Sequence, residues 1–217
     1  MLTPGGMHHI RHFIWDFDGT LFDTYPTIIA DLRSALQEWG GDCDPVLTMQ
    51  MMLVNIPNAR NYYADKYGID RQALSDAYHR WHDKSTAFLA AQPVDGAREV
   101  LEKIRATGGR SYIFTHRSSV ETRMYLQKYG LEEYFHDIIG PDTPGFAVKP
   151  APDAVLHLMR KYDMRPNDTV MVGDRDCDLG SGRNAGIGSV HLVCAVAPEA
   201  LECTWKLTSL RDMLELL

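Results

Sequence analysis

The stretch His12-Phe-Ile-Trp-Asp16-Phe-Asp18-Gly19-Thr20 decides the fold of this chain. Its apolar residues predict a short buried strand, which ends by Gly19. Asp16 and Asp18 then lie at the carboxyl end of a strand, where open α/β sheets bind ligands. Two carboxylates this close are costly unless they share a cation or a proton. Mg²⁺ prefers carboxylate and carbonyl oxygen, so the stretch favours a magnesium site, although Asp-x-Asp is also common in turns.

The remaining chain has two kinds of pattern. From residue 93 onward, helices alternate with predicted strands and a helical tail ends the chain; the strands are at 111–115, 137–139, 169–173 and 189–193. This alternation predicts right-handed βαβ units and a parallel sheet covered on both faces. Residues 24–91 show only helical periodicity, with a turn at 55–58.

We therefore expect two domains. Residues 1–23 and 92–217 would form an α/β core domain, and residues 24–91 would form an all-helical domain inserted after the first strand. A single α/β domain with additional helices is the alternative, because domain boundaries are hard to place from one sequence.

Composition narrows the class of protein. The 217 residues are 45% apolar and carry a net charge of −7, which argues against nucleic acid as a partner. We find neither a bilayer-spanning stretch nor an apolar signal core, so we expect no membrane association. Four cysteines without a C-x-x-C pair predict reduced thiols and a cytoplasmic protein. The N-terminal histidines, which could bind a metal, are more simply a leader running into the first strand.

Further polar residues follow the predicted strands. Thr115 ends one strand, and its hydroxyl could donate to a phosphate oxygen or cap the next helix. Arg117 could hold a second anionic group of a substrate or be a solvated loop charge. Lys149 precedes a proline that suits a first helical turn, a place where lysine is usually on the surface. Asp174 and Asp178 follow strand 169–173, where aspartate can also serve as a helix cap.

In this order, these residues resemble the four motifs of the haloacid dehalogenase-like (HAD) hydrolases, which are mostly magnesium-dependent phosphatases with an aspartate nucleophile. The matching residues are Asp16-Phe-Asp18-Gly19-Thr20-Leu-Phe-Asp23, then Thr115, then Lys149-Pro150, then Gly173-Asp174 with Asp178. The resemblance implies a Rossmann-like parallel sheet as the core, with an inserted all-helical cap domain.

The resemblance also implies a role for each matching residue. Asp16 would be the nucleophile and Asp18 the general acid and base, with Thr115 and Lys149 completing the catalytic set. The Mg²⁺ ligands would be Asp16, the backbone carbonyl of Asp18 and Asp174. Asp178 would be a further ligand or would hold one of the ligands in place. Asp176 falls between the motif positions and is not a candidate. The expected substrate-binding residues are Gly19, Thr20, Thr115, His116, Arg117 and Lys149.

The function implied is a phosphatase that hydrolyses a small phosphorylated metabolite through an aspartyl-phosphate intermediate, as in phosphoglycolate phosphatases. Dehalogenases of this fold lack an acid two residues after the nucleophile. The presence of Asp18 therefore favours phosphate esters over haloacids as the substrate class. One alternative is a sugar-phosphate mutase of the β-phosphoglucomutase type, for which Arg60 is the candidate cap residue. Another is a catalytically silent binding protein. The sequence indicates neither the substrate nor the oligomeric state.

Overall fold

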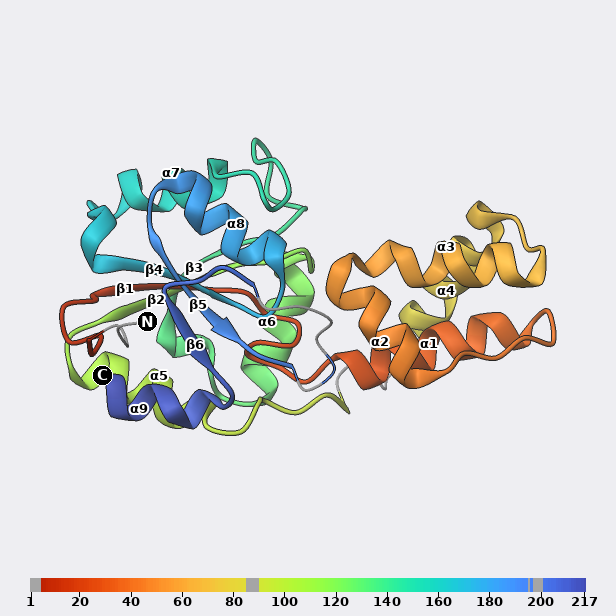
Figure 1. Cartoon of the computed structure of the whole chain (residues 1–217), viewed down its shortest axis with the longest axis horizontal. Coiled ribbons are helices and arrows are strands. Elements are labelled where there is room, and N and C mark those ends of the chain that lie inside the picture. The colour runs from red at the N-terminus through yellow and green to blue at the C-terminus, as the bar shows by residue number, and fades with distance from the viewer. Residues whose placement is uncertain (1–4, 85–89, 195, 197–200) are drawn as a thin grey trace. The chain divides into compact units, whose positions relative to one another are not determined.

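The computed structural model describes residues 5–84, 90–194, 196 and 201–217 (Figure 1). These residues divide into two compact units. One unit contains strands β1 to β6 and helices α5 to α9, and the other contains helices α1 to α4. The predicted fold class, a Rossmann-like parallel sheet with an inserted all-helical segment, is confirmed. In this part of the chain, no helix is both long and apolar enough to cross a bilayer.

The sheet has the order β3-β2-β1-β4-β5-β6, and every neighbouring pair is parallel. Its strands are β1 (His12–Trp15), β2 (Arg110–Phe114), β3 (Phe135–Ile139), β4 (Thr169–Gly173), β5 (Gly188–Leu192) and β6 (Trp205–Leu207). Strand order reverses between β1 and β4, and at such a point the connections leave on opposite faces of the sheet. The carboxyl ends of β1 and β4 therefore border the crevice in which sheets of this order bind ligands.

The five strands predicted from sequence are confirmed, with ends shifted by no more than two residues. The helical tail was wrong in part, because Trp205–Leu207 forms the sixth strand and pairs in parallel with β5. This edge strand has three residues, too few for a visible alternation of apolar and polar positions. Among the described residues, the tail is helical only in a 3₁₀ turn (Leu210–Asp212) and in α9 (Met213–Leu216).

Helices cover both faces of the sheet, with α7 and α8 on one face and α5 and α9 on the other (Figure 1). The core-unit helices are α5 (Ala97–Ala106), α6 (Ser119–Lys128), α7 (Asp153–Lys161) and α8 (Asp176–Ala185). The apolar side of α7 packs on the sheet, where Leu158 joins a buried cluster with Ile14, Tyr112 and Met171. This packing holds β1, β2 and β4 together beneath the loops that follow them.

The second unit consists of α1 (Tyr25–Gln37), α2 (Pro45–Val54), α3 (Ile56–Tyr67) and α4 (Arg71–Lys84). The turn expected at 55–58 was wrong: Asn55 alone separates α2 from α3, with an extended backbone at φ −161° and ψ 127°. The turn was inferred in part from Pro57, since proline breaks the interior of a helix. Proline is well tolerated in a first helical turn, which is where Pro57 lies. Within the segment 24–91 that we expected to be helical, residues 85–89 lie outside the described residues.

We predict that Leu158→Ala destabilises the protein by about 2–5 kcal/mol, because it leaves a cavity in a fully buried cluster. Urea denaturation of the full chain measures the loss as a lower midpoint. Leu156→Ala is the matched control, since Leu156 lies on the same helix and is only partly buried. Equal losses for the two variants would contradict the packing described for α7.

Candidate active site

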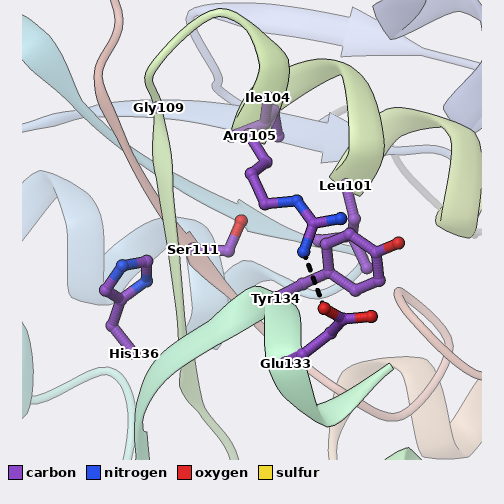
Figure 2. Close-up of a pocket in the computed structure, with 8 residues that line it drawn as sticks. All are labelled: Leu101, Ile104, Arg105, Gly109, Ser111, Glu133, Tyr134 and His136. Carbon is purple, nitrogen blue, oxygen red and sulfur yellow. Dashed lines mark hydrogen bonds and ion pairs between the residues drawn. The ribbon is translucent and has the colours of Figure 1, made fainter. Parts of the chain in front are cut away.

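A small cavity lies at the amino end of β2, away from the strand ends that carry the predicted site (Figure 2). Its volume of about 20 Å³ is enough for one water molecule and no larger ligand. Arg105 and Glu133 pair at 2.9 Å beside it. The residues that line it are Leu101, Ile104, Arg105, Gly109, Ser111, Glu133, Tyr134 and His136. None of them is a predicted site residue, and the predicted residues lie at the opposite ends of the strands.

At the carboxyl ends of β1 and β4, a buried lysine bridges two aspartates. The Lys149 ammonium donates to Oδ1 of Asp16 and lies 2.6 Å from Oδ1 of Asp178. Asp16 follows β1 directly, and its amide donates to the carbonyl of Val172 in β4 at 2.8 Å, which extends the ladder between the two strands. All three charged side chains are almost completely buried. Lys149 is therefore not the surface lysine that its position before a proline would usually indicate.

The charges in this cluster shift one another's protonation. Burial and the nearby Asp178 carboxylate raise the pKa of Asp16 above its usual value, although Lys149 opposes the shift. Burial alone would lower the pKa of Lys149, but the carboxylates of Asp16 and Asp178 raise it. Burial would also raise the pKa of Asp178, but Lys149 and Arg175 lower it. The lysine is thus a permanent cation that favours the ionised form of both carboxylates.

Asp174 completes a group of three acids. One carboxylate oxygen from each of Asp16, Asp174 and Asp178 lies within 4.8 Å of the others, and all three residues are buried. Thr20 donates its hydroxyl to Asp174 at 3.3 Å. A Cβ at Gly173 would come within 2.3 Å of the Cβ of Asp178, so only glycine allows the helix to approach the strand end this closely.

This cluster fits a divalent cation. Oδ2 of Asp16 is buried and has no hydrogen-bond partner among the described residues. Among the described residues of the core unit, the buried charged side chains are four acids and three cations, namely Asp16, Asp18, Asp174 and Asp178 with Arg117, Lys149 and Arg175. Buried charges are costly unless compensated, and hard oxygen ligands suit Mg²⁺. An unpartnered carboxylate oxygen and one negative charge in excess both favour such an ion.

The remaining predicted residues after β2 are also near the cluster. Thr115 is buried, and its hydroxyl accepts a hydrogen bond from the amide of Arg117 at 3.0 Å. Burial, Lys149 and Arg175 lower the pKa of His116 to about 4, so its imidazole is neutral near pH 7. Nε2 of His116 is buried and has no hydrogen-bond partner among the described residues. It is therefore available to a ligand.

Two predicted substrate-binding groups already have partners in the loop after β1. The amide of Gly19 donates to the carbonyl of Phe22 at 2.8 Å, and Gly19 has φ +78°, a conformation that favours glycine. The hydroxyl of Thr20 donates to Asp174. These contacts give both residues a role in shaping the loop, and they lend no support to a direct contact with substrate.

Arg117 is not a solvated loop charge. It is 8% exposed, and its guanidinium donates to Asp18 through Nη2 at 2.8 Å and through Nε at 3.0 Å. A buried pair of this kind needs tertiary contacts that bring residues 99 positions apart together. Spacing along the sequence could not have indicated it.

One buried residue escaped the sequence analysis. Arg175 lies between the two acids of the fourth motif, is 3% exposed, and donates its amide to Oδ2 of Asp178 at 3.0 Å. Its guanidinium Nε is 3.9 Å from the same carboxylate oxygen. A cation flanked by acids in a loop usually indicates a solvated residue, so only its burial identifies it as part of the site.

Comparisons with known proteins agree with this geometry. The model of the haloacid dehalogenase-like hydrolase family matches residues 13–192. A phosphoglycolate phosphatase of Nitrosospira multiformis is 29% identical over 192 residues, which cover 85% of this chain and 82% of that protein. A tyrosine-protein kinase, PtkA, of Mycobacterium tuberculosis is also 29% identical, over 178 residues that cover 82% of this chain and 60% of the relative. Relatives of similar identity therefore carry different names.

The fold also resembles solved structures. A predicted phosphoglycolate phosphatase from Haemophilus somnus aligns with a TM-score of 0.83 and covers 97% of this chain and 99% of its own. Its sequence identity is 19%, so this likeness concerns the fold alone.

We predict that Lys149→Met destabilises the protein by about 3–5 kcal/mol near neutral pH, because it leaves two buried carboxylates without their cation. The deficit should narrow as the pH falls, since a protonated acid costs less to bury than a carboxylate. Urea denaturation at several pH values measures both effects. Lys161→Met is the control: its pair with Asp137 is half exposed, so its loss should cost less than about 1 kcal/mol. A pH-independent deficit for Lys149→Met would contradict the charge arrangement.

Proposed function

This chain belongs to the haloacid dehalogenase-like hydrolases, and from that premise we propose that it is a magnesium-dependent phosphatase. It hydrolyses a small-molecule phosphate monoester through an aspartyl-phosphate intermediate. One observation carries the proposal: Asp16 is buried, one of its carboxylate oxygens is held by Lys149, and the other has no hydrogen-bond partner among the described residues. An oriented carboxylate with one available oxygen is suited to nucleophilic attack.

Asp16, Asp174, Asp178 and the backbone carbonyl of Asp18 would hold the magnesium ion, with Asp178 as a ligand or as the residue that orients Lys149. The three side chains form the acidic group described above. When bound, Mg²⁺ supplies positive charge that lets an anionic carboxylate approach an anionic phosphate.

The reaction has two steps. The available oxygen of Asp16 forms a bond to phosphorus while the bond from phosphorus to the ester oxygen breaks, and Asp18 gives its proton to the departing alkoxide. A water molecule then attacks the phosphorus of the aspartyl phosphate and gives a proton to Asp18. The bond between Asp16 and phosphorus breaks, which releases inorganic phosphate and restores both carboxyl groups.

The remaining side chains bind and orient the phosphoryl group. Lys149 is a buried cation beside the nucleophile, and it stabilises the negative charge on the phosphoryl oxygens. Thr115 and His116 add neutral hydrogen-bonding groups, of which Nε2 of His116 has no other described partner. In-line positioning and charge stabilisation of this kind provide most of the catalysis in phosphoryl transfer.

We propose that residues 24–91 act as a cap that excludes water and selects the substrate. A small phosphorylated metabolite such as 2-phosphoglycolate is the first candidate, following the name of the Nitrosospira relative. The free cysteines Cys43, Cys177, Cys194 and Cys203 favour a reducing compartment, the cytoplasm. Arg60 contacts His79 and the ring of Tyr78 within its own unit, and these contacts do not support a role as a mutase residue.

We predict that Asp16→Asn lowers phosphate release from p-nitrophenyl phosphate with Mg²⁺ by about a thousandfold or more, because an amide cannot replace the carboxylate nucleophile. Asp176→Asn is the control, since Asp176 is exposed and pairs with Arg183 outside the cluster. It should retain wild-type turnover. Undiminished turnover by Asp16→Asn would remove Asp16 from its role and refute the proposed mechanism.

We predict that Mg²⁺ raises the thermal denaturation midpoint of the wild-type protein, because a ligand that binds only the folded state stabilises it by about 2.7 kcal/mol at a hundred times its Kd. Asp174→Asn should lose most of this shift, whereas Asp176→Asn should keep it. Differential scanning calorimetry over a range of Mg²⁺ concentrations measures the shift. Equal shifts for the two variants would exclude Asp174 as a ligand.

A further inference from the structure

Arg117 is held on several sides, although it follows a strand end where loops are usually mobile. Its amide donates to the hydroxyl of Thr115 at 3.0 Å. Its guanidinium carbon lies 5.9 Å from the ring centroid of Phe17 and 5.4 Å from that of Tyr125. Nη1 donates to Glu121, in the first turn of α6, at 3.2 Å. A guanidinium packed and bonded in this way has little rotational freedom.

The same guanidinium determines how the carboxylate of Asp18 is oriented. Its Nη2 and Nε donate at 2.8 and 3.0 Å, and both hydrogen bonds end on Oδ1. A bidentate contact would usually engage both carboxylate oxygens. Here the two donors converge on one oxygen, so Arg117 holds the Asp18 carboxylate through Oδ1.

We propose that Arg117 is a positioning residue that orients the carboxyl group of Asp18 toward the ester oxygen of the substrate. This inference rests on the proposed function. In the first step, the carboxyl group of Asp18 gives its proton to the ester oxygen as the bond from that oxygen to phosphorus breaks. In the second step, the Asp18 carboxylate takes a proton from the attacking water. Arg117 gains and loses no proton and acts only through Asp18.

The proposal differs from direct binding of the substrate by Arg117. Three of its nitrogens already donate to carboxylates of the protein, through Nε, Nη1 and Nη2. A second anionic group on a substrate would have to compete with Asp18 and Glu121 for this guanidinium. The observed contacts therefore favour a role inside the site over a role in recognising charge on the substrate.

Proton delivery matters most when the leaving group is a strong base. An alkoxide leaves poorly unless it is protonated, whereas p-nitrophenolate is stable as an anion and needs little help. General acid catalysis typically contributes a factor of about 10²–10⁴, and its efficiency depends on hydrogen-bond geometry. A loss of positioning should therefore slow the hydrolysis of alkyl phosphates far more than that of p-nitrophenyl phosphate.

The test compares Arg117→Lys with wild type on both kinds of ester. The alkyl ester is whichever the wild-type protein turns over fastest from a panel that includes 2-phosphoglycolate and glycerol 3-phosphate. Lysine keeps the charge and the aliphatic stem but loses the planar pair of donors. We expect kcat for the alkyl ester to fall by about tenfold or more and kcat for p-nitrophenyl phosphate to change less than about threefold. KM should change little for either ester.

A double-mutant cycle separates action through Asp18 from direct action. In the Asp18→Asn background, Arg117→Lys should cause little further loss with the alkyl ester, because the group it positions is already inactive. Arg123→Lys is the matched control: Arg123 forms a half-exposed pair with Glu132 and should leave both activities unchanged. Circular dichroism and the Mg²⁺-induced thermal shift show whether each variant is folded and binds metal. If Arg117→Lys is not folded or does not bind metal, Arg117→Gln replaces it in the test.

Three results would overturn the inference. They are an equal loss with both esters, a rise in KM without loss of kcat, and a further loss of tenfold or more in the Asp18→Asn background. In each case the wild-type protein still hydrolyses the esters, so the proposed function stands. If the wild-type protein releases phosphate from none of the esters with Mg²⁺, the proposed function is wrong and the inference falls with it.

Discussion

The structure depends on one constraint: acids buried at the edge of a sheet must be compensated by cations. Lys149 contacts Asp16 and Asp178 together, and all three are nearly inaccessible to water. Two carboxylates buried without this ammonium would be strongly destabilising, and the lysine alone would be no better tolerated. The charges that hold the loops after β1 and β4 together are the same charges that the proposed reaction uses. Stability and chemistry are therefore coupled at this edge of the sheet.

The sheet topology supplies the place where this compensation happens. Because β1 is central and neighbours β4, the residues that follow these two strands meet at the point where strand order reverses. Asp16 follows one strand and Asp174 the other, while Gly173 lets the helix that carries Asp178 approach closely. Apolar packing of α7 against the sheet positions the strands, and the loops at their ends then have little freedom. A rigid framework of this kind lets small side chains be placed accurately.

A second buried cation, Arg117, holds the other acid of the first motif, Asp18. Arg117 packs against the rings of Phe17 and Tyr125 and holds Asp18, while Lys149 holds Asp16. The two acids that are one residue apart in the sequence are thus bound by different cations. This separation gives them different surroundings, which suits the different roles that we propose for them, Asp16 as nucleophile and Asp18 as proton donor. In the proposed mechanism, the loop after β2 therefore acts on the proton-transfer step through Asp18, and the Arg117 guanidinium does not contact the phosphoryl group.

The sequence by itself determined the alternation of strands and helices, the helical insertion and the acids at the strand ends. These features are local, because periodicity and glycine or proline positions act within a few residues of one another. It missed β6, whose three residues are recognisable only from their pairing with β5, and it placed a turn at 55–58, where Pro57 lies in the first turn of α3. Only the tertiary structure decided which cation faces which acid: Arg117 with Asp18, Lys149 with Asp16, and the buried Arg175 beside Asp178. The sequence around a charged residue does not indicate whether its side chain is solvated or buried, because the packing of distant segments determines its partner.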